Sequence, residues 1–177
     1  VRYEIENLTG TAASTDLMQI CSTVIAEGGY SEKGIIRQGG NRMAAKSVST
    51  SLVPLASFRL KAAMNRATVW PLSFDILNTS NTYVHYQIIL RGSLTGAAWT
   101  GESDAVEIDT AATAVSGGMV IGGGYVSKDL RVSSNNLDLA VPLCADIDGT
   151  ADILTIAAVS LSGSSPMYSG VTGKELV

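Results

Sequence analysis

Reactive and charged side chains are scarce in this sequence. Of its 177 residues, 16% are charged, one is a histidine (His85) and two are cysteines, Cys21 and Cys144. A hydrolytic triad needs a base, but His85 stands in a strand-like run, and no serine lies in a GxSxG turn. The two cysteines have no CxxC or histidine neighbour, which disfavours zinc and favours buried small hydrophobic roles. We therefore expect no enzyme activity, no catalytic residue, no metal and no cofactor.

Basic stripes and long apolar runs are also missing. The net charge is −4, so a polyanion is a poor partner and no nucleic-acid binding is expected. The longest apolar run, 153–161, is broken by Thr155 and Ser160 and falls far short of the ~20 residues of a membrane helix. No basic-then-apolar leader opens the chain, and Val1 leaves open whether it is cut from a longer precursor. No membrane association is expected.

Small residues dominate what is present. The sequence has 18 glycines and only four prolines, with serine and threonine throughout. This composition is typical of short strands joined by small-residue turns, not of helices. The length fits one domain with a sizeable core, so we expect a single β-sandwich domain over 1–177.

The stretch 51–92 predicts three consecutive strands, at 52–60, 70–76 and 83–90. The second alternates Trp70, Leu72, Phe74 and Ile76 with Pro71, Ser73 and Asp75, which indicates one buried face. The third places Val84, Tyr86, Ile88 and Leu90 on one face. We interpret the three as a β-meander at the heart of a β-sandwich.

Further strands are expected on both sides of this stretch. They are 1–8, 17–30, 105–109, 119–127, 137–143 at an edge, and 152–161. Segment 17–30 also fits a helical stripe, although its β-branched residues favour a strand. Segment 31–49 reads as a long basic loop, either solvated or used for binding. The whole predicts an all-β protein with an antiparallel two-sheet sandwich, jelly-roll-like, of about eight strands.

Three glycines interrupt the strand predicted at 119–127. Gly122, Gly123 and Gly124 indicate a bulge or a place where another backbone approaches closely. A neighbouring subunit could supply that backbone, so these glycines are candidate interface residues. The positive mean hydropathy agrees with buried contacts between subunits.

Acidic residues offer two candidate sites, and each has a plainer interpretation. Glu102, Asp104, Glu107 and Asp109 could supply a glycosidase pair, but an exposed strand face explains Glu107 and Asp109. The stretch 146–152 resembles half of a calcium loop without its later ligands, and a turn is favoured. Neither glycine-rich run fits a phosphate loop.

Three aromatic residues are candidates for stacking on sugar rings. They are Tyr30, Trp99 and Tyr168, interpreted as loop aromatics; Tyr30 directly follows Gly28-Gly29, where the strand expected in 17–30 ends. If they are exposed beside polar side chains, a carbohydrate- or receptor-binding module is favoured, and if they are buried, a structural role.

Four phrases resemble virion structural proteins of tailed phages and large viruses. The phrases are RYEIEN at 2–7, QICSTVIAEGGY at 19–30, SFRLKAAMNRATVWPLSFDILNTSN at 57–81 and ATAVSGGMVIGGGYVS at 112–127. Proteins of this group are capsid-decoration, collar or fibre-tip β-sandwich modules, some fused to collagen-like repeats. The segment 170–175 departs from the aromatic ending of that group.

The resemblance implies a location in the virion, after assembly in the host cytoplasm. It implies a homotrimer that contacts other virion proteins. A host surface glycan is a further partner only in the alternative in which the candidate aromatic residues stack on sugar rings. It carries over no active-site residues.

Overall fold

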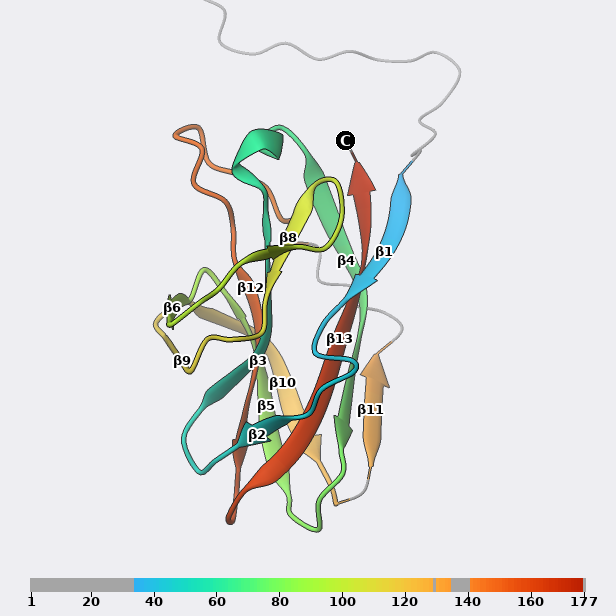
Figure 1. Cartoon of the computed structure of the whole chain (residues 1–177), viewed down its shortest axis with the longest axis vertical. Helices are drawn as coiled ribbons and strands as arrows, with labels where there is room; N and C mark the ends of the chain where they lie inside the picture. The colour runs from blue at the N-terminus through green and yellow to red at the C-terminus, as the bar shows by residue number, and fades with distance from the viewer. Residues whose placement is uncertain (1–33, 129, 135–140, 177) are drawn as a thin grey trace, which may run out of the picture. The chain divides into compact units, whose positions relative to one another are not determined.

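The computed structural model describes residues 34–128, 130–134 and 141–176, and the side chains of Ser133 and Ser134 are not described. All strand pairs are antiparallel, and the described residues belong to one compact unit, 33–177. Sheet A consists of β1 (Ile35–Gly39), β2 (Lys46–Val48), β4 (Thr68–Asn78), β11 (Arg131–Ser134) and β13 (Ser165–Leu176). Its order is β1-β13-β4-β11, and β2 also pairs with β13 (Figure 1).

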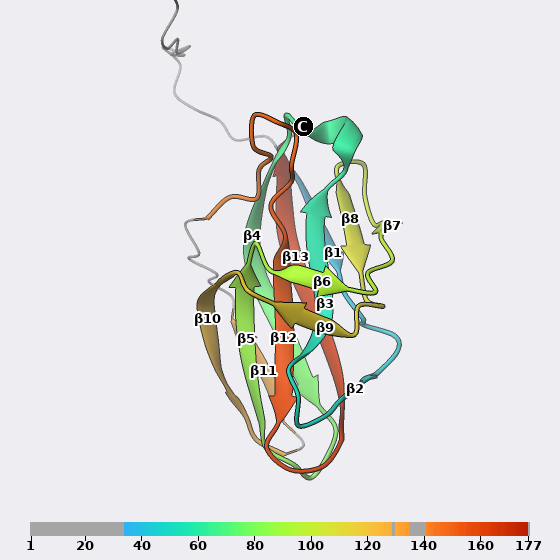
Figure 2. The same cartoon turned by 90° about the vertical axis from the view of Figure 1, so that its left-hand side faces the viewer.

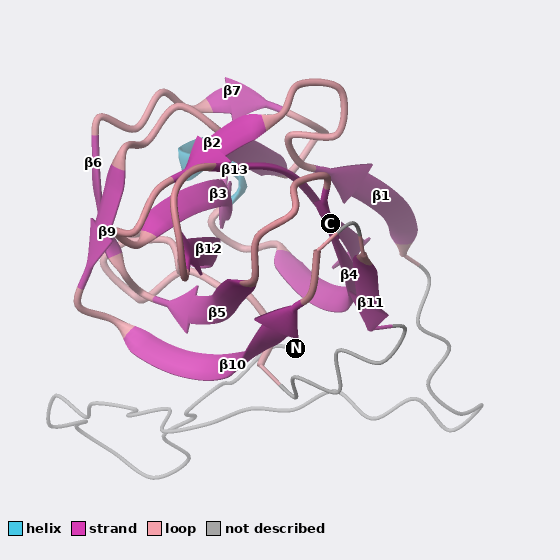
Figure 3. Cartoon of the chain, turned by 90° about the horizontal axis from the view of Figure 1, so that it is seen from below, coloured by secondary structure: helices cyan, strands magenta, loops and turns pink. Residues whose placement is uncertain are grey.

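Sheet B is the second layer of the sandwich (Figure 3). It consists of β3 (Val53–Leu60), β5 (Val84–Leu90), β7 (Thr100–Gly101), β8 (Val106–Asp109), β10 (Met119–Val126) and β12 (Leu154–Ser160), in the order β10-β5-β12-β3-β8-β7. A separate ribbon pairs β6 (Ser93–Thr95) with β9 (Ala114–Ser116). The described residues hold no α-helix, only the 3₁₀ turn η1 (Ala62–Met64).

The strand order is that of a jelly roll. We count β1 and β2 as one broken first strand, because both pair with β13. The principal strands in chain order are then β1/β2, β3, β4, β5, β10, β11, β12 and β13. Sheet A contains the first (β1/β2), eighth (β13), third (β4) and sixth (β11) of these strands, in that order. Sheet B contains the second (β3), seventh (β12), fourth (β5) and fifth (β10), in that order. This is the interleaved pattern of two Greek keys, so the predicted fold class is confirmed.

The predicted β-meander is wrong, although its three strands exist. β3, β4 and β5 follow one another in the chain, but β4 lies in sheet A and the other two in sheet B. Within sheet B, β12 separates β3 from β5. The links 61–67 and 79–83 are longer than tight two-residue hairpin turns, and they carry the chain from one sheet to the other.

The buried face of β4 also differs from the expectation. Phe74 and Ile76 are buried, but Trp70 is half-buried and Leu72 is exposed, while Pro71 is buried instead. The pairing with β13 shifts register at this point, so that Leu72 has no partner. A β-bulge of this kind moves the following residues to the opposite face, which divides the apparent alternation into two halves.

The core lies between the two sheets. Its fully buried large side chains include Leu55, Leu60, Ile76, Leu154, Ile156 and Met167. The β6–β9 ribbon lies across the outer face of sheet B (Figure 2). Beneath it, outward-facing Ser57 and Thr155 are buried and joined by a 3.0 Å hydrogen bond between their hydroxyls. Sheet B is therefore covered on part of both faces, whereas no described strand lies across the outer face of sheet A.

Several other expected strands are confirmed. β8 lies within 105–109, β10 within 119–127 and β12 within 152–161. β5 buries the predicted face of Val84, Tyr86, Ile88 and Leu90. β10 also carries the expected bulge, between Val120 and Gly122.

Two expectations for other segments are wrong in part. Segment 31–49 contains β1 and β2, which the alternation rule missed because residues 35–38 are all exposed and only their backbone pairs with β13. In 137–143, the described residues form no strand, and Leu143 makes a single bridge to Val69. Pro142 lacks the N–H that a longer ladder would use. Residues 1–33, with the strands expected at 1–8 and 17–30, lie outside the described part, so a single domain over 1–177 stays a prediction.

Candidate functional site

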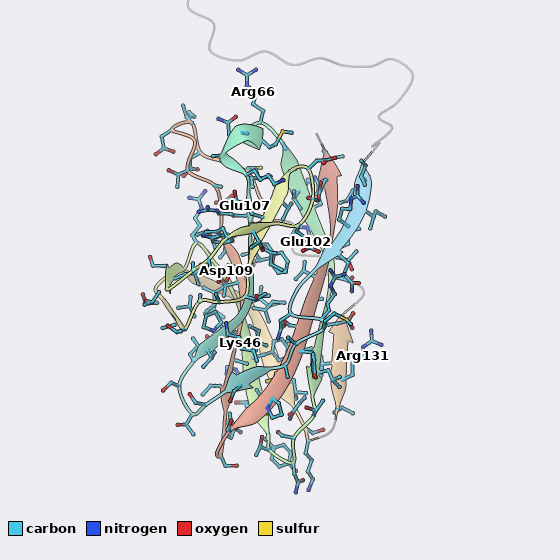
Figure 4. All side chains as sticks on the ribbon, viewed as in Figure 1. Lys46, Arg66, Glu102, Glu107, Asp109 and Arg131 are labelled. Carbon is cyan, nitrogen blue, oxygen red and sulfur yellow. The ribbon has the colours of Figure 1, made fainter. Side chains whose placement is uncertain are left out.

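Of the four acidic residues at 102–109, the three labelled in Figure 4, Glu102, Glu107 and Asp109, have different partners, whereas Asp104 is exposed. Glu102 accepts a 2.8 Å hydrogen bond from Arg42, and Glu107 accepts a 2.9 Å bond from Nη2 of Arg59. Arg42 lies on the link between β1 and β2, whereas Arg59 belongs to β3. Each glutamate is thus neutralised by its own arginine. Such ion pairs connect neighbouring segments of the surface, and they do not bring two carboxylates together as a glycosidase pair would require.

The expectation that Asp109 lies on an exposed strand face is wrong, because it is 1% exposed. Its Oδ1 accepts the backbone N–H of Ala98 at 2.7 Å and of Ala111 at 3.1 Å, and its Oδ2 accepts that of Ala112 at 3.1 Å. The chain leaves β8 at this residue, so the carboxylate satisfies N–H groups that have no strand partner. Asp109 is a structural residue.

Lys46 is held next to the same loop. Its Nζ donates to the carbonyls of Thr110 and Ala112, both at 2.7 Å. Burial lowers the pKa of Lys46, and the negative charge of Asp109 partly offsets this effect. The side chain therefore ties β2 to the loop after β8.

The loop at 146–152 forms the favoured turn. Gly149 has a φ of 88°, and its N–H donates to the Asp146 carbonyl at 2.9 Å. The guanidinium of Arg91 contacts Oδ1 of Asp152 at 2.5 Å and Oδ1 of Asp146 at 3.0 Å. A cation from the chain itself thus lies between these carboxylates. Within 34–128, 130–134 and 141–176, no three His, Cys, Asp or Glu side chains form a group that could hold a metal ion.

The three candidate aromatic residues do not meet in one site. Tyr30 lies outside the described residues. Trp99 is half-buried just before β7 in sheet B, and the guanidinium carbon of Arg59 stands 4.1 Å from its ring centroid. One face of the indole is therefore covered by a cation. Tyr168 lies on β13 in sheet A, where it lines a surface groove.

This groove, called the Tyr168 groove below, has a volume of about 180 Å³ on the outer face of sheet A. It is lined by Gln38, Arg42, Asp75, Leu77, Arg131, Tyr168, Ser169 and Gly170. The strand register explains the hollow. Tyr168, Leu77 and Arg131 stand in one row across three strands, and Gly170 faces Asp75 in the next row. A glycine thus occupies a position where a side chain would otherwise stand.

Charge in the groove is balanced. Oδ1 of Asp75 accepts bonds from Nε of Arg131 at 2.9 Å and from Nη2 at 2.6 Å. Arg42, on the opposite side, is paired with Glu102. The lining itself holds two arginines and one aspartate, and Glu102, just outside it, supplies the second negative charge. With Glu102 included, the groove offers hydrogen-bonding groups without a net charge of either sign.

Strand β10 is a second surface feature. It stands at an edge of sheet B and carries no charged residue. Its exposed side chains are Met119 (63%), Val120 (56%) and Tyr125 (70%). The ring centroid of Tyr125 lies 4.9 Å from that of His85, which is half-buried near the start of β5.

The β10 glycines have individual explanations. A Cβ at Gly123 would lie 2.7 Å from the Tyr86 carbonyl, and one at Gly124 would lie 3.1 Å from the Tyr86 ring. The backbone that approaches Gly123 closely is thus that of β5. A Cβ at Gly122 would meet only ordinary contacts with Ile88. The role of the three glycines in a subunit interface stays a prediction.

Sequence reasoning found Tyr168 but missed its neighbours in the groove. Gln38, Arg42, Asp75 and Arg131 come from four separate segments, and only the jelly-roll register brings them together. No spacing in the sequence signals that arrangement.

Comparison with known proteins finds no matching family model, no matching curated protein and no matching solved structure. In the part of the chain that is described, no helix is long and apolar enough to cross a membrane.

Proposed function

We propose that this chain is a structural subunit of a virion, a capsid-decoration, collar or fibre component that assembles with copies of itself. The observation that carries the proposal is the edge strand β10, whose outer edge pairs with no other described strand and which exposes Met119, Val120 and Tyr125. The jelly roll is a scaffold of viral capsid proteins as well as of lectins, so the fold class agrees by analogy.

Edge strands of soluble proteins usually carry devices that prevent pairing. Charged side chains, prolines and bulges are the common ones. β10 has a bulge near Val120 but neither a charge nor a proline along its eight residues. A strand of this kind is suited to pairing with another chain.

A second copy is the partner that this chemistry favours. A neutral strand does not repel itself, and its apolar side chains match those of an identical surface. Two copies of β10 related by a two-fold axis would give a dimer. Three copies close into the expected homotrimer if β10 of each copy meets a different edge of its neighbour.

Light scattering coupled to size exclusion, over a wide range of concentration, tests this proposal. The unmodified chain is expected to form a trimer or another closed assembly. Val120→Lys places a charge on the edge and should yield monomers, whereas Ile147→Lys, at a fully exposed loop position, should assemble normally. An unmodified chain that stays monomeric at every concentration would contradict self-assembly.

The virion location needs a separate test. We expect mass spectrometry of purified particles to detect the chain at a stoichiometry set by particle symmetry. Its absence from particles of the virus that encodes it would contradict the structural role.

A receptor- or carbohydrate-binding module is the second candidate. The Tyr168 groove favours it, because an aromatic side chain stands there beside Asp75, Arg131 and Gln38.

A further inference from the structure

Gly170 is a glycine that the fold does not require. Its φ is not in the left-handed region. A Cβ built on it would lie 3.5 Å from Nε2 of Gln38, 3.5 Å from the carbonyl oxygen of Gly39 and 3.7 Å from Cγ of Arg42. These are ordinary van der Waals distances. A larger residue would also suit a strand better, because glycine weakens strand interiors. The effect of glycine here is to leave the floor of the Tyr168 groove open.

The walls of the groove combine an aromatic ring with unused hydrogen-bonding groups. Tyr168 is half-buried and lines the groove, so part of its side chain faces solvent. Arg131 bonds only Oδ1 of Asp75, which leaves Oδ2 without a partner among the described residues. The amide of Gln38 also has no hydrogen-bond partner in that part of the chain, and Arg42 uses only Nη2 for Glu102.

We infer that the Tyr168 groove binds one sugar residue of a neutral glycan. A pyranose ring presents an apolar C–H face that packs on an aromatic side chain. Its neighbouring hydroxyls both donate and accept, which suits a carboxylate oxygen beside an amide and a guanidinium.

Charge and size narrow the class of ligand. The ion pairs Asp75–Arg131 and Arg42–Glu102 leave the groove without the excess positive charge that an anionic sugar or a phosphate would require. The volume of about 180 Å³ is smaller than the roughly 300–1000 Å³ of sites for drug-sized ligands. A single ring fits this size, and the rest of the glycan would extend over the open face of sheet A.

This inference does not depend on self-association. The groove lies on sheet A and β10 on sheet B, so each can be altered without changing the other. A monomeric Val120→Lys variant should still bind sugar, and a chain that binds no sugar could still assemble. The failure of one proposal is thus distinguishable from the failure of the other.

Titration of the full chain with simple glycosides tests the site. The neutral probes are the methyl glycosides of glucose, galactose and mannose, and the anionic probes are N-acetylneuraminic acid and inorganic phosphate. Saturation-transfer NMR detects binding, and we expect at least one neutral probe to bind with a Kd of about 10 mM or tighter.

Three variants connect binding to the groove. Gly170→Thr fills the floor and should weaken binding at least tenfold while the melting temperature stays equal or rises. Tyr168→Ala should weaken binding by a similar factor. Tyr83→Ala removes an exposed tyrosine outside the groove and should bind like the unmodified chain.

Three outcomes would overturn the inference. The first is that no neutral probe binds within that range. The second is binding that is unchanged in both Gly170→Thr and Tyr168→Ala. The third is binding of the anionic probes alone, which would show that the groove recognises charge.

Discussion

Ser169 donates two hydrogen bonds to one oxygen of Asn41, from its backbone N–H at 2.7 Å and from its hydroxyl at 2.6 Å. The Asn41 amide nitrogen donates in turn to the carbonyls of Met167, at 3.0 Å, and Ala44, at 3.3 Å. One buried side chain therefore fixes the loop between β1 and β2 against β13.

Replacement of Asn41 by alanine should destabilise the protein strongly. It removes four hydrogen bonds and leaves buried backbone groups unsatisfied, so we expect a loss of about 3 kcal/mol. That loss corresponds to a fall in melting temperature of about 6–12 °C for a chain of this size. Calorimetry measures it, with Asn81→Ala as the matched exposed control. Similar melting temperatures for the two variants would contradict the role assigned to Asn41.

Replacement by alanine should destabilise the protein at one glycine of β10 and have little effect at its neighbour. The new Cβ of Gly123→Ala would press on the Tyr86 carbonyl, and moving backbone should cost about 2 kcal/mol. Gly122→Ala meets only ordinary contacts and restricts the unfolded chain, so its stability should change by less than about 1 kcal/mol. Urea unfolding of the two variants checks this difference. Equal stabilities would mean that β10 does not approach β5 as described.

Asp109 should matter far more to stability than its neighbour Asp104. Asp109→Ala leaves three backbone N–H groups without their charged acceptor, and we expect a loss of at least about 3 kcal/mol. Asp104 is exposed, so Asp104→Ala should stay within about 0.5 kcal/mol of the parent chain. Chemical denaturation distinguishes the two. If Asp109→Ala changes the free energy of unfolding as little as Asp104→Ala does, the structural role assigned to Asp109 would be contradicted.

Tyr86 should make stability fall at high pH. Burial raises the pKa of its phenol above the usual 10.0. The unfolded chain therefore ionises first, and the stabilisation present below pH 10.0 is lost as the pH rises through the folded-state pKa. Tyr86→Phe should lose less stability than the parent chain in this window.

The exposed Tyr83 supplies the control for this measurement. Tyr83→Phe should follow the parent curve of unfolding free energy against pH. The lowered pKa of Lys46 affects stability in the opposite direction, but it is common to all three chains and cancels in the comparison. Parallel curves for Tyr86→Phe and the parent would exclude Tyr86 as the source.

The class of fold could be predicted from the sequence, but its central strand could not. In β13 the buried positions are Ser165, Met167, Ser169, Val171, Gly173 and Glu175, together with Gly170. Burial alternates along most of the strand, but Ser165, Ser169 and Glu175 are polar. Hydrogen bonds such as that from Ser165 Oγ to Asn78 Oδ1, at 2.8 Å, make this burial tolerable. A pattern based on hydrophobicity cannot detect it.

The candidate site was predictable only in part, for a related reason. Tyr168 could be singled out as an aromatic residue in a polar segment. Asp75 and Arg131 look like ordinary surface charges until the pairing of β4 with β11 brings them together. Gly170 could be connected to the groove only from the structure, which shows that neither its backbone conformation nor its neighbours exclude a Cβ.

The position of β13 has a consequence for synthesis on the ribosome. This strand pairs with β1, β2 and β4, and it joins Glu175 to Ile35, near the opposite end of the described chain. Until β13 leaves the exit tunnel, β1 and β2 have no partner among the described strands, and β4 has only β11. Sheet A must therefore close after translation of this region is complete, and the nascent chain has to be protected from pairing with its neighbours on a polysome.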